Sequence, residues 1–228
     1  MKLNIKELLD FLDDKKDSQM GDANAIIAVL GEDLNASAYK HFRGGKVEIL
    51  NDSVLPGTNK GKRLDRWILD KTNNNLFQCE IKNWAATAIG GKSLKSDASI
   101  EETKKIVEYY WKRELNNNLS SKGEHPNGVT KVLLKMKLPD KHSKIKVQPL
   151  LIYWMPISSD IDGLHPLSVV SVKSLHLPMV TEFSKLYVFS VSLYLRQLYK
   201  NGKGQKLIDI DTPHFEHRIK ILNKLGDK

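Results

Sequence analysis

One segment in the second half of the chain constrains the fold more than any other. Residues 146–156 are strand-like, and their middle reads LeuLeuIleTyrTrp without a charged side chain. An unbroken apolar run suits a central strand that is covered on both faces, because a strand with one solvated face alternates apolar and polar residues. Helices must then pack on the sheet from both sides. We therefore expect an α/β domain with a central mixed β-sheet flanked by helices.

The rest of the chain supplies helices and strands for such a domain. In residues 23–42 apolar side chains recur at helical spacing, and Gly44-Gly45 follows as a stop signal. No internal repeat and no long linker divides the chain, so we expect one domain over residues 1–228. The predicted helices cover residues 5–12, about 23–42, 96–119, a segment ending near residue 199, and 212–225. The predicted strands cover residues 46–55, 63–70, 76–84, 146–156 and 186–191. Residues 132–138 fit either a helix or a strand.

The charge balance favours an acidic partner. The chain has 36 Lys and Arg against 27 Asp and Glu, which gives a net charge of +9 and a pI near 9.4. Such a balance favours polyanions such as nucleic acid, although a solvated lysine-rich surface would produce the same numbers. Nucleic acid, and DNA in particular, is the partner that we predict.

The sequence also predicts a cytoplasmic location. Its one cysteine, Cys79, excludes an internal disulfide framework, and no Cys/His spacing resembles a zinc site. No apolar run is long enough to span a bilayer, so no membrane partner is expected. Residues 1–17 carry acids and lack an apolar core, so we interpret them as an amphipathic helix rather than a signal peptide.

Two charged residues interrupt an otherwise apolar strand. Residues 78–84 read GlnCysGluIleLysAsnTrp, and strand alternation points Glu80 and Lys82 to the same face. Cys79 and Ile81 then point to the opposite face, toward the core. An acid-x-Lys pattern is weak by itself in a chain so rich in lysine, and a surface ion pair would explain it equally well.

The preceding strand gives the pair a third member. If residues 71–75 form a hairpin turn, residues that face one another have numbers that sum to roughly 145–147. Asp65 then lies beside Glu80 and Lys82, whereas Asp70 lies next to the turn, about 13 Å away at about 3.3 Å per residue. Geometry therefore favours Asp65 over Asp70.

Two neighbouring carboxylates repel each other unless a cation lies between them. Oxygen ligands alone suit magnesium or manganese rather than zinc. We therefore predict a Mg²⁺ site, in which Mn²⁺ can substitute, at Asp65 and Glu80.

This arrangement resembles the PD-(D/E)xK nuclease superfamily, whose core runs helix, strand, Asp-bearing strand, strand with Glu-x-Lys, and helix. The match covers roughly residues 23–119, and residues 120–228 would complete the sheet and add helices. The resemblance implies a restriction-endonuclease-like core. It also implies that Asp65 and Glu80 are metal ligands and that Lys82 is a catalytic lysine, which positions the attacking water and balances charge on the scissile phosphate.

Many members of the superfamily carry a further acidic residue on the first core helix. Glu32 fits that position best, and Asp33 is its alternative; a solvated helix face would explain either. The chain departs from the literal pattern at Leu64, which stands where the superfamily name has proline.

Basic residues flank the two strands and are candidates to contact phosphates, unless they form only a solvated loop. Residues 89–93 resemble the end of a phosphate-binding P-loop, but residue 86 is alanine where that motif needs glycine, so nucleotide hydrolysis is not expected. The predicted nucleic-acid contacts are Lys60, Lys62, Arg63 and Lys92.

The predicted function is that of a magnesium-dependent endonuclease, a hydrolase that cleaves phosphodiester bonds, most simply in DNA. The alternatives are a nuclease-like module that binds nucleic acid without cutting it, and a non-catalytic protein whose basic face binds acidic partners. The sequence leaves DNA and RNA substrates open. It also leaves open a homodimer, since cutting both strands of a duplex often requires two active sites.

Overall fold

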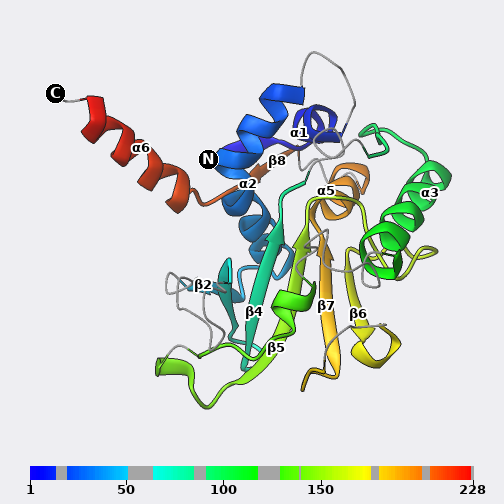
Figure 1. Cartoon of the computed structure of the whole chain (residues 1–228). Helices are drawn as coiled ribbons and strands as arrows, with labels where there is room; N and C mark the ends of the chain where they lie inside the picture. Colours follow the sequence, from blue (N-terminus) through cyan, green and yellow to red (C-terminus); the bar gives the residue numbers. More distant parts are fainter. Residues whose placement is uncertain are drawn as a thin grey trace.

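The computed structural model describes residues 1–13, 20–50, 64–84, 91–117, 129–138, 140–175, 180–201 and 206–226. A six-stranded mixed sheet forms its centre (Figure 1). In sheet order the strands are β2 (Val47–Leu50), β3 (Arg66–Asp70), β4 (Asn75–Lys82), β5 (Lys146–Tyr153), β7 (Lys185–Ser190) and β6 (Leu167–Ser171).

The three middle strands are parallel, and both edges of the sheet are antiparallel. β4 pairs with β5 and β5 with β7 in parallel, whereas β2–β3, β3–β4 and β6–β7 are antiparallel pairs. β5 lies between two parallel neighbours, and its residues from Pro149 to Tyr153 are buried or nearly so. The prediction of an α/β domain with a central mixed sheet is therefore confirmed, and the apolar run is its central strand.

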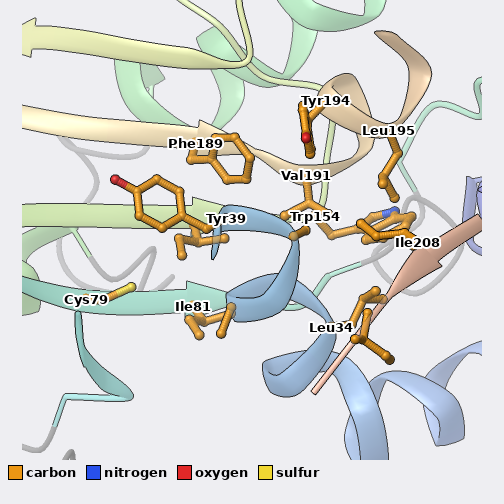
Figure 2. Packing of buried hydrophobic residues seen from close by; sticks show 14 of the residues in the cluster. Leu34, Tyr39, Cys79, Ile81, Trp154, Phe189, Val191, Tyr194, Leu195 and Ile208 are labelled. Carbon is orange, nitrogen blue, oxygen red and sulfur yellow. The ribbon is translucent and has the colours of Figure 1, made fainter. Parts of the chain in front are cut away.

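Helices cover both faces of the sheet, which is why β5 has no solvated face. One face packs under α1 (Ile5–Asp13), α2 (Met20–Phe42) and α5 (Val191–Lys200), and the other under α3 (Ile100–Trp111) and α4 (Val129–Val132). Figure 2 shows the core of the first face, where Cys79 and Ile81 of β4 lie beside Tyr39 and Leu34 of α2. The alternation in residues 78–84 therefore predicted correctly which side chains face the core.

Three further elements complete the chain. β1 (Lys2–Asn4) and β8 (Leu207–Asp209) form a separate antiparallel pair, which joins the start of the chain to the segment before the last helix. The last helix, α6 (Pro213–Gly226), follows β8. Shorter helical turns lie at Lys112–Asn117, Asp140–His142 and Val172–Ser174.

Most predicted elements appear with shifted ends. The helix expected from residue 96 begins at Ile100, because the Ser99 hydroxyl accepts from the Glu102 N–H and the Glu102 side chain accepts from the Ser99 N–H, a capping box that fixes the first turn. The ambiguous residues 132–138 contain the end of α4, then a turn and chain without regular secondary structure. The sequence did not predict β1, β6 or β8, which are short and lack a clear alternation.

A buried ion pair ties the first helix to the core. Asp13, the last residue of α1, accepts from the Arg196 guanidinium at 2.8 Å and from the Trp154 indole N–H at 2.7 Å. The three side chains are almost fully buried, and they come from α1, from the residue that follows β5, and from α5. Burial raises the pKa of the Asp13 carboxyl although Arg196 opposes the shift. Its charge is therefore tolerated only because both donors are present.

Within the described residues, no helix has both the length and the apolar character needed to cross a membrane.

Arg196→Met should destabilise the fold by about 3–5 kcal/mol, because it leaves the Asp13 carboxylate buried without its charge partner. Urea unfolding followed by circular dichroism measures the loss. Lys6→Met is the control, since the Lys6–Asp10 pair is exposed and its removal should change little. Equal stability of Arg196→Met and the unaltered chain would contradict this account of the core.

Candidate active site

The β3–β4 hairpin brings Asp65 and Glu80 together. β3 and β4 pair so that Arg66 faces Cys79 and Asp70 faces Asn75, and the numbers of each pair sum to 145. Asp65 continues this register: its N–H donates to the Cys79 carbonyl at 3.2 Å, and its Oδ2 accepts from the Ile81 N–H at 2.7 Å. The hairpin register that the sequence predicted is therefore correct.

Asp70 lies at the turn end of the hairpin, where the register pairs it with Asn75. Its carboxylate is buried and accepts from the Arg43 guanidinium at 2.8 Å. It also accepts from the N–H groups of Thr72 and Asn73, at 2.9 Å and 3.3 Å, and so closes the hairpin turn. Asp70 stabilises the turn that sets the register, and it takes no part in the carboxylate pair.

Glu80 lies between two lysines. Its Oε1 is 2.8 Å from Lys82 Nζ on the same strand face, as the sequence predicted. Its Oε2 is 2.6 Å from Nζ of Lys131, and the same ammonium lies 3.8 Å from Oδ1 of Asp65. Lys82 also lies over the Trp84 ring, 5.6 Å from its centroid. Two carboxylates and two ammonium groups therefore form a four-charge cluster with a net charge of zero.

Lys131 belongs to α4, and β4 itself holds that short helix in place. Gln78, two residues before Glu80 on the same strand face, is buried and donates through Nε2 to the carbonyls of Val132 and Leu134, the latter at 2.8 Å. Val132 and Leu133 pack into the core on this side of the sheet. The strand that carries Glu80 thus positions the helix that brings Lys131 to it.

Burial perturbs both carboxyl groups. It raises the pKa of Asp65, against the lowering effect of the Ile81 N–H and Lys131. Burial followed by repulsion from Asp65 raises the pKa of Glu80, although both lysines act in the opposite direction. Burial raises both pKa values, and the charge of Asp65 raises that of Glu80 further, so the pair favours a bound cation.

Glu32 of α2 lies at the edge of this cluster. Its Oε2 is 2.9 Å from Arg66 Nη2 and 3.7 Å from Nδ1 of His214 in α6, and its charge contributes to the raised pKa of Asp65. Asp33, the alternative, accepts from the N–H groups of His214 and Phe215 at 3.0 Å each and caps α6. Both acids lie near Arg66 Nη2, Glu32 at 2.9 Å and Asp33 at 3.9 Å, but of the two only the charge of Glu32 contributes to the raised pKa of Asp65.

The structure describes one of the four predicted phosphate contacts. Lys60, Lys62 and Arg63 lie outside the described residues. Lys92 lies against α3, with Nζ 4.9 Å from the centroid of the Tyr109 ring, and its carbonyl accepts from the Tyr110 hydroxyl at 3.1 Å. That hydroxyl approaches Gly91 so closely that any side chain there would collide with it, which explains a glycine at this position without a phosphate.

The donor set suits a hard divalent cation but does not complete its coordination. Asp65 and Glu80 offer carboxylate oxygens, the ligand type that magnesium and manganese prefer. The described part of the chain contains no group of three His, Cys, Asp or Glu side chains placed to hold a metal ion. The two carboxylates would therefore hold such an ion with backbone carbonyls, water or substrate oxygens as the remaining ligands.

Sequence reasoning missed Lys131 and Arg66. Lys131 is one of 36 basic residues and lies beside a polar segment without helical periodicity, so nothing in the sequence sets it apart. Arg66 directly follows Asp65 in a predicted strand, and alternation could have shown that it points away from the Asp65 side chain. The identity of its partner, Glu32, depends on where α2 crosses the hairpin.

No family model, curated protein or solved structure matches this chain.

Glu80→Gln should raise the melting temperature at neutral pH in a metal-free buffer. The pKa of Glu80 is raised in the folded state, so the unfolded chain ionises first and the folded chain loses stability as pH rises through that interval. The amide removes this loss, and its advantage should disappear in acid, where both states hold the proton. Scanning calorimetry at several pH values measures the difference.

Glu102→Gln provides a control of opposite sign. The Ser99 N–H and hydroxyl lower the pKa of Glu102, so the amide should reduce stability at neutral pH. A lower melting temperature for Glu80→Gln at neutral pH would show that its two lysine pairs outweigh the effect of burial.

Proposed function

We propose that the chain is a magnesium-dependent endonuclease of the PD-(D/E)xK, restriction-endonuclease-like type. The observation that carries the proposal is the cluster formed by Asp65, Glu80 and Lys82, in which the buried carboxylate of Glu80 and the half-buried carboxylate of Asp65 share one cationic neighbour, Lys131. A purely structural surface strand has no need for two mutually repelling acids with raised pKa values.

The order of elements supports the same proposal. α2 precedes β2, the Asp-bearing segment leads into β3, β4 carries Glu-x-Lys, and α3 follows, which is the order that the resemblance implies. The parallel pairing of β4 with β5 then places the hairpin at one side of a larger sheet. The restriction-endonuclease-like core is part of the proposal.

In this proposal Asp65 and Glu80 hold Mg²⁺, or Mn²⁺ in its place. The bound ion neutralises charge on a phosphodiester, activates a water molecule and stabilises the leaving oxygen. Lys82 holds its ammonium 2.8 Å from Glu80, fixed further by the Trp84 ring, where it can orient the attacking water and balance the charge that develops on phosphorus. Arg66 holds Glu32 at the border of the site, so that Glu32 can accept a hydrogen bond from a further water.

The net charge of +9 supports a nucleic-acid substrate, with DNA as the first candidate. The four-charge cluster is neutral by itself, so a divalent ion raises its charge to +2. That value matches the two negative charges of a phosphodiester attacked by hydroxide.

Asp65→Ala and Glu80→Ala should each abolish magnesium-dependent cleavage of plasmid or oligonucleotide substrates, because each removes a carboxylate ligand. Lys82→Ala should retain metal and DNA binding and lose about 10²–10³-fold in turnover. Glu48→Ala, which removes an exposed acid on β2, is the control and should cut normally. Asp70→Ala is a poor control because it removes the side chain that closes the turn.

A panel of duplex DNA, single-stranded DNA, junctions and RNA decides the substrate. Salt-sensitive DNA binding without cleavage by the unaltered chain would contradict the nuclease and favour a non-cleaving module on the same fold. Wild-type rates in Lys82→Ala would remove the catalytic assignment of that lysine.

Lys131→Met should tighten Mn²⁺ binding about tenfold, which corresponds to about 1.4 kcal/mol. The Lys131 ammonium contacts the same oxygens that a divalent ion needs, so it competes with the ion for them. Isothermal titration calorimetry measures the affinity without any cleavage. Lys135→Met, which alters an exposed lysine just beyond α4, should leave the affinity unchanged. Weaker Mn²⁺ binding by Lys131→Met would show that Lys131 supports the ion instead of competing with it.

A further inference from the structure

The last helix exposes an apolar surface that the rest of the described chain does not cover. α6 has no buried residue, and Figure 1 shows it extending away from the sheet beyond α2. Leu222 is 60% exposed and Leu225 is 68% exposed, and Ile221 is also open to solvent. An apolar helix surface that projects into solvent is typical of an interaction site rather than of an isolated helix.

α6 is anchored at one end only. Asp33 caps its first turn, and Arg218 donates to the carbonyls of Ala28 and Val29 of α2. Beyond Arg218 the helix has two more turns. On these turns Ile219 and Leu222 continue an apolar stripe that begins at Phe215, and Ile221 and Leu225 widen it on one side. The basic residues of these turns lie on the opposite side of the helix, where Lys224 follows Ile221 at i+3 and borders the apolar surface.

A groove with the complementary character lies between α1 and α2. Its volume is about 560 Å³, and Leu8 and Phe11 of α1 face Ile26, Leu30 and other apolar residues of α2 across it. The only charged side chains among its described lining residues are two acids of α1, Glu7 and Asp10.

Asp10 is already paired with Lys6 at 2.6 Å. Glu7 forms hydrogen bonds with Asn4, and among the described residues no ion pair to it is present within 4.0 Å. The groove therefore offers apolar walls and an unneutralised acid, and α6 offers apolar side chains beside lysines.

The helix does not occupy the groove of its own chain. No residue of α6 belongs to the described lining of the groove. Its first turns are held on α2, where Asp33 caps it and Arg218 donates to the carbonyls of Ala28 and Val29. The apolar side chains beyond Arg218 are therefore exposed and open to a second copy.

We propose that α6 of one copy docks in the α1/α2 groove of a second copy, and that the exchange is reciprocal. Each chain carries both halves of the contact, so a two-fold symmetric pair uses each half twice and leaves neither open. Leu222 and Leu225 enter the groove between the apolar side chains of α1 and α2. Lys224, which borders the apolar surface of α6, lies at its rim near Glu7.

A second copy fits these observations better than nucleic acid does. Phosphates would pair with Lys220 and Lys224 but would leave Ile221, Leu222 and Leu225 in water. The groove would also remain empty, and its acidic rim repels a polyanion. The contact does not depend on the proposed cleavage, and its test measures size and proximity rather than activity.

Sedimentation velocity of the full chain over a concentration series tests the proposal. The unaltered chain should form a dimer, and Leu222→Asp/Leu225→Asp should raise the dimer dissociation constant at least about tenfold, because it places carboxylates against an apolar, acidic groove. Ile26→Asp, on the groove side, should have the same effect. Val180→Asp is the control, since Val180 is an exposed apolar residue outside both surfaces. All four positions are exposed, so the three variants should fold.

Disulfide trapping tests which surfaces meet. Ile26→Cys and Leu222→Cys, prepared separately and then mixed under mild oxidation, should give a covalent dimer that forms much less in either variant alone. Cys79 does not interfere because it is fully buried. A chain that stays monomeric at all concentrations overturns the proposal, and so does a dimer that the aspartate variants leave intact. Unchanged size together with weakened DNA binding in Leu222→Asp/Leu225→Asp also overturns it and assigns α6 to nucleic acid.

Discussion

The parallel pairing of β4 with β5 is the constraint on which the rest of the structure depends. β5 is buried on both faces, and its register with β4 places Cys79 beside Leu150 and Glu80 beside Leu151. One face of β4 thereby joins the core beneath α2 (Figure 2), and the other must accommodate Glu80 and Lys82 inside the sheet. A carboxylate in that position needs cations close to it, because burial alone would favour its neutral form. Lys82 and Lys131 supply them.

The cost of keeping two acids together explains several features around the hairpin. Asp65 accepts a hydrogen bond from the Ile81 N–H, and Glu80 contacts two lysines. The pKa values of Asp65 and Glu80 are raised nevertheless. The local hydrogen bonds and ion pairs therefore stabilise the two charged carboxylates only in part. This is typical of sites where function and not stability determines the residues. The surrounding structure offsets the cost: Asp70 closes the turn, and Gln78 holds α4 in place.

α2 connects the proposed site to the proposed docking surface. Three successive residues of α2 contribute to these two places. Glu32 pairs with Arg66, the residue that follows Asp65. Asp33 caps α6, and Leu34 lines the groove against α1. A helix has several faces, so a single element can do all of this without internal conflict. In a reciprocal dimer the two carboxylate clusters would be held at a fixed separation by two copies of this one helix. That arrangement would suit a substrate that must be cut on both strands.

The sequence by itself determined what depends on short-range periodicity and turn chemistry. The unbroken apolar run identified the central strand, and alternation placed Glu80 and Lys82 on one face with Cys79 on the other. The turn expected at residues 71–75 predicted the register that selects Asp65. These features follow from the geometry of a strand and a hairpin, which neighbouring residues specify.

Only the tertiary structure decided which distant groups complete the site. Lys131 reaches Glu80 from 51 residues away because α4 packs on β4, and Glu32 meets Arg66 because α2 crosses the hairpin. It also decided that Asp33 caps a helix 180 residues later and that Asp70 holds a turn. Charged residues are abundant in this chain and look alike in sequence, so their partners are set by how helices pack on the sheet, and packing is a property of the whole fold.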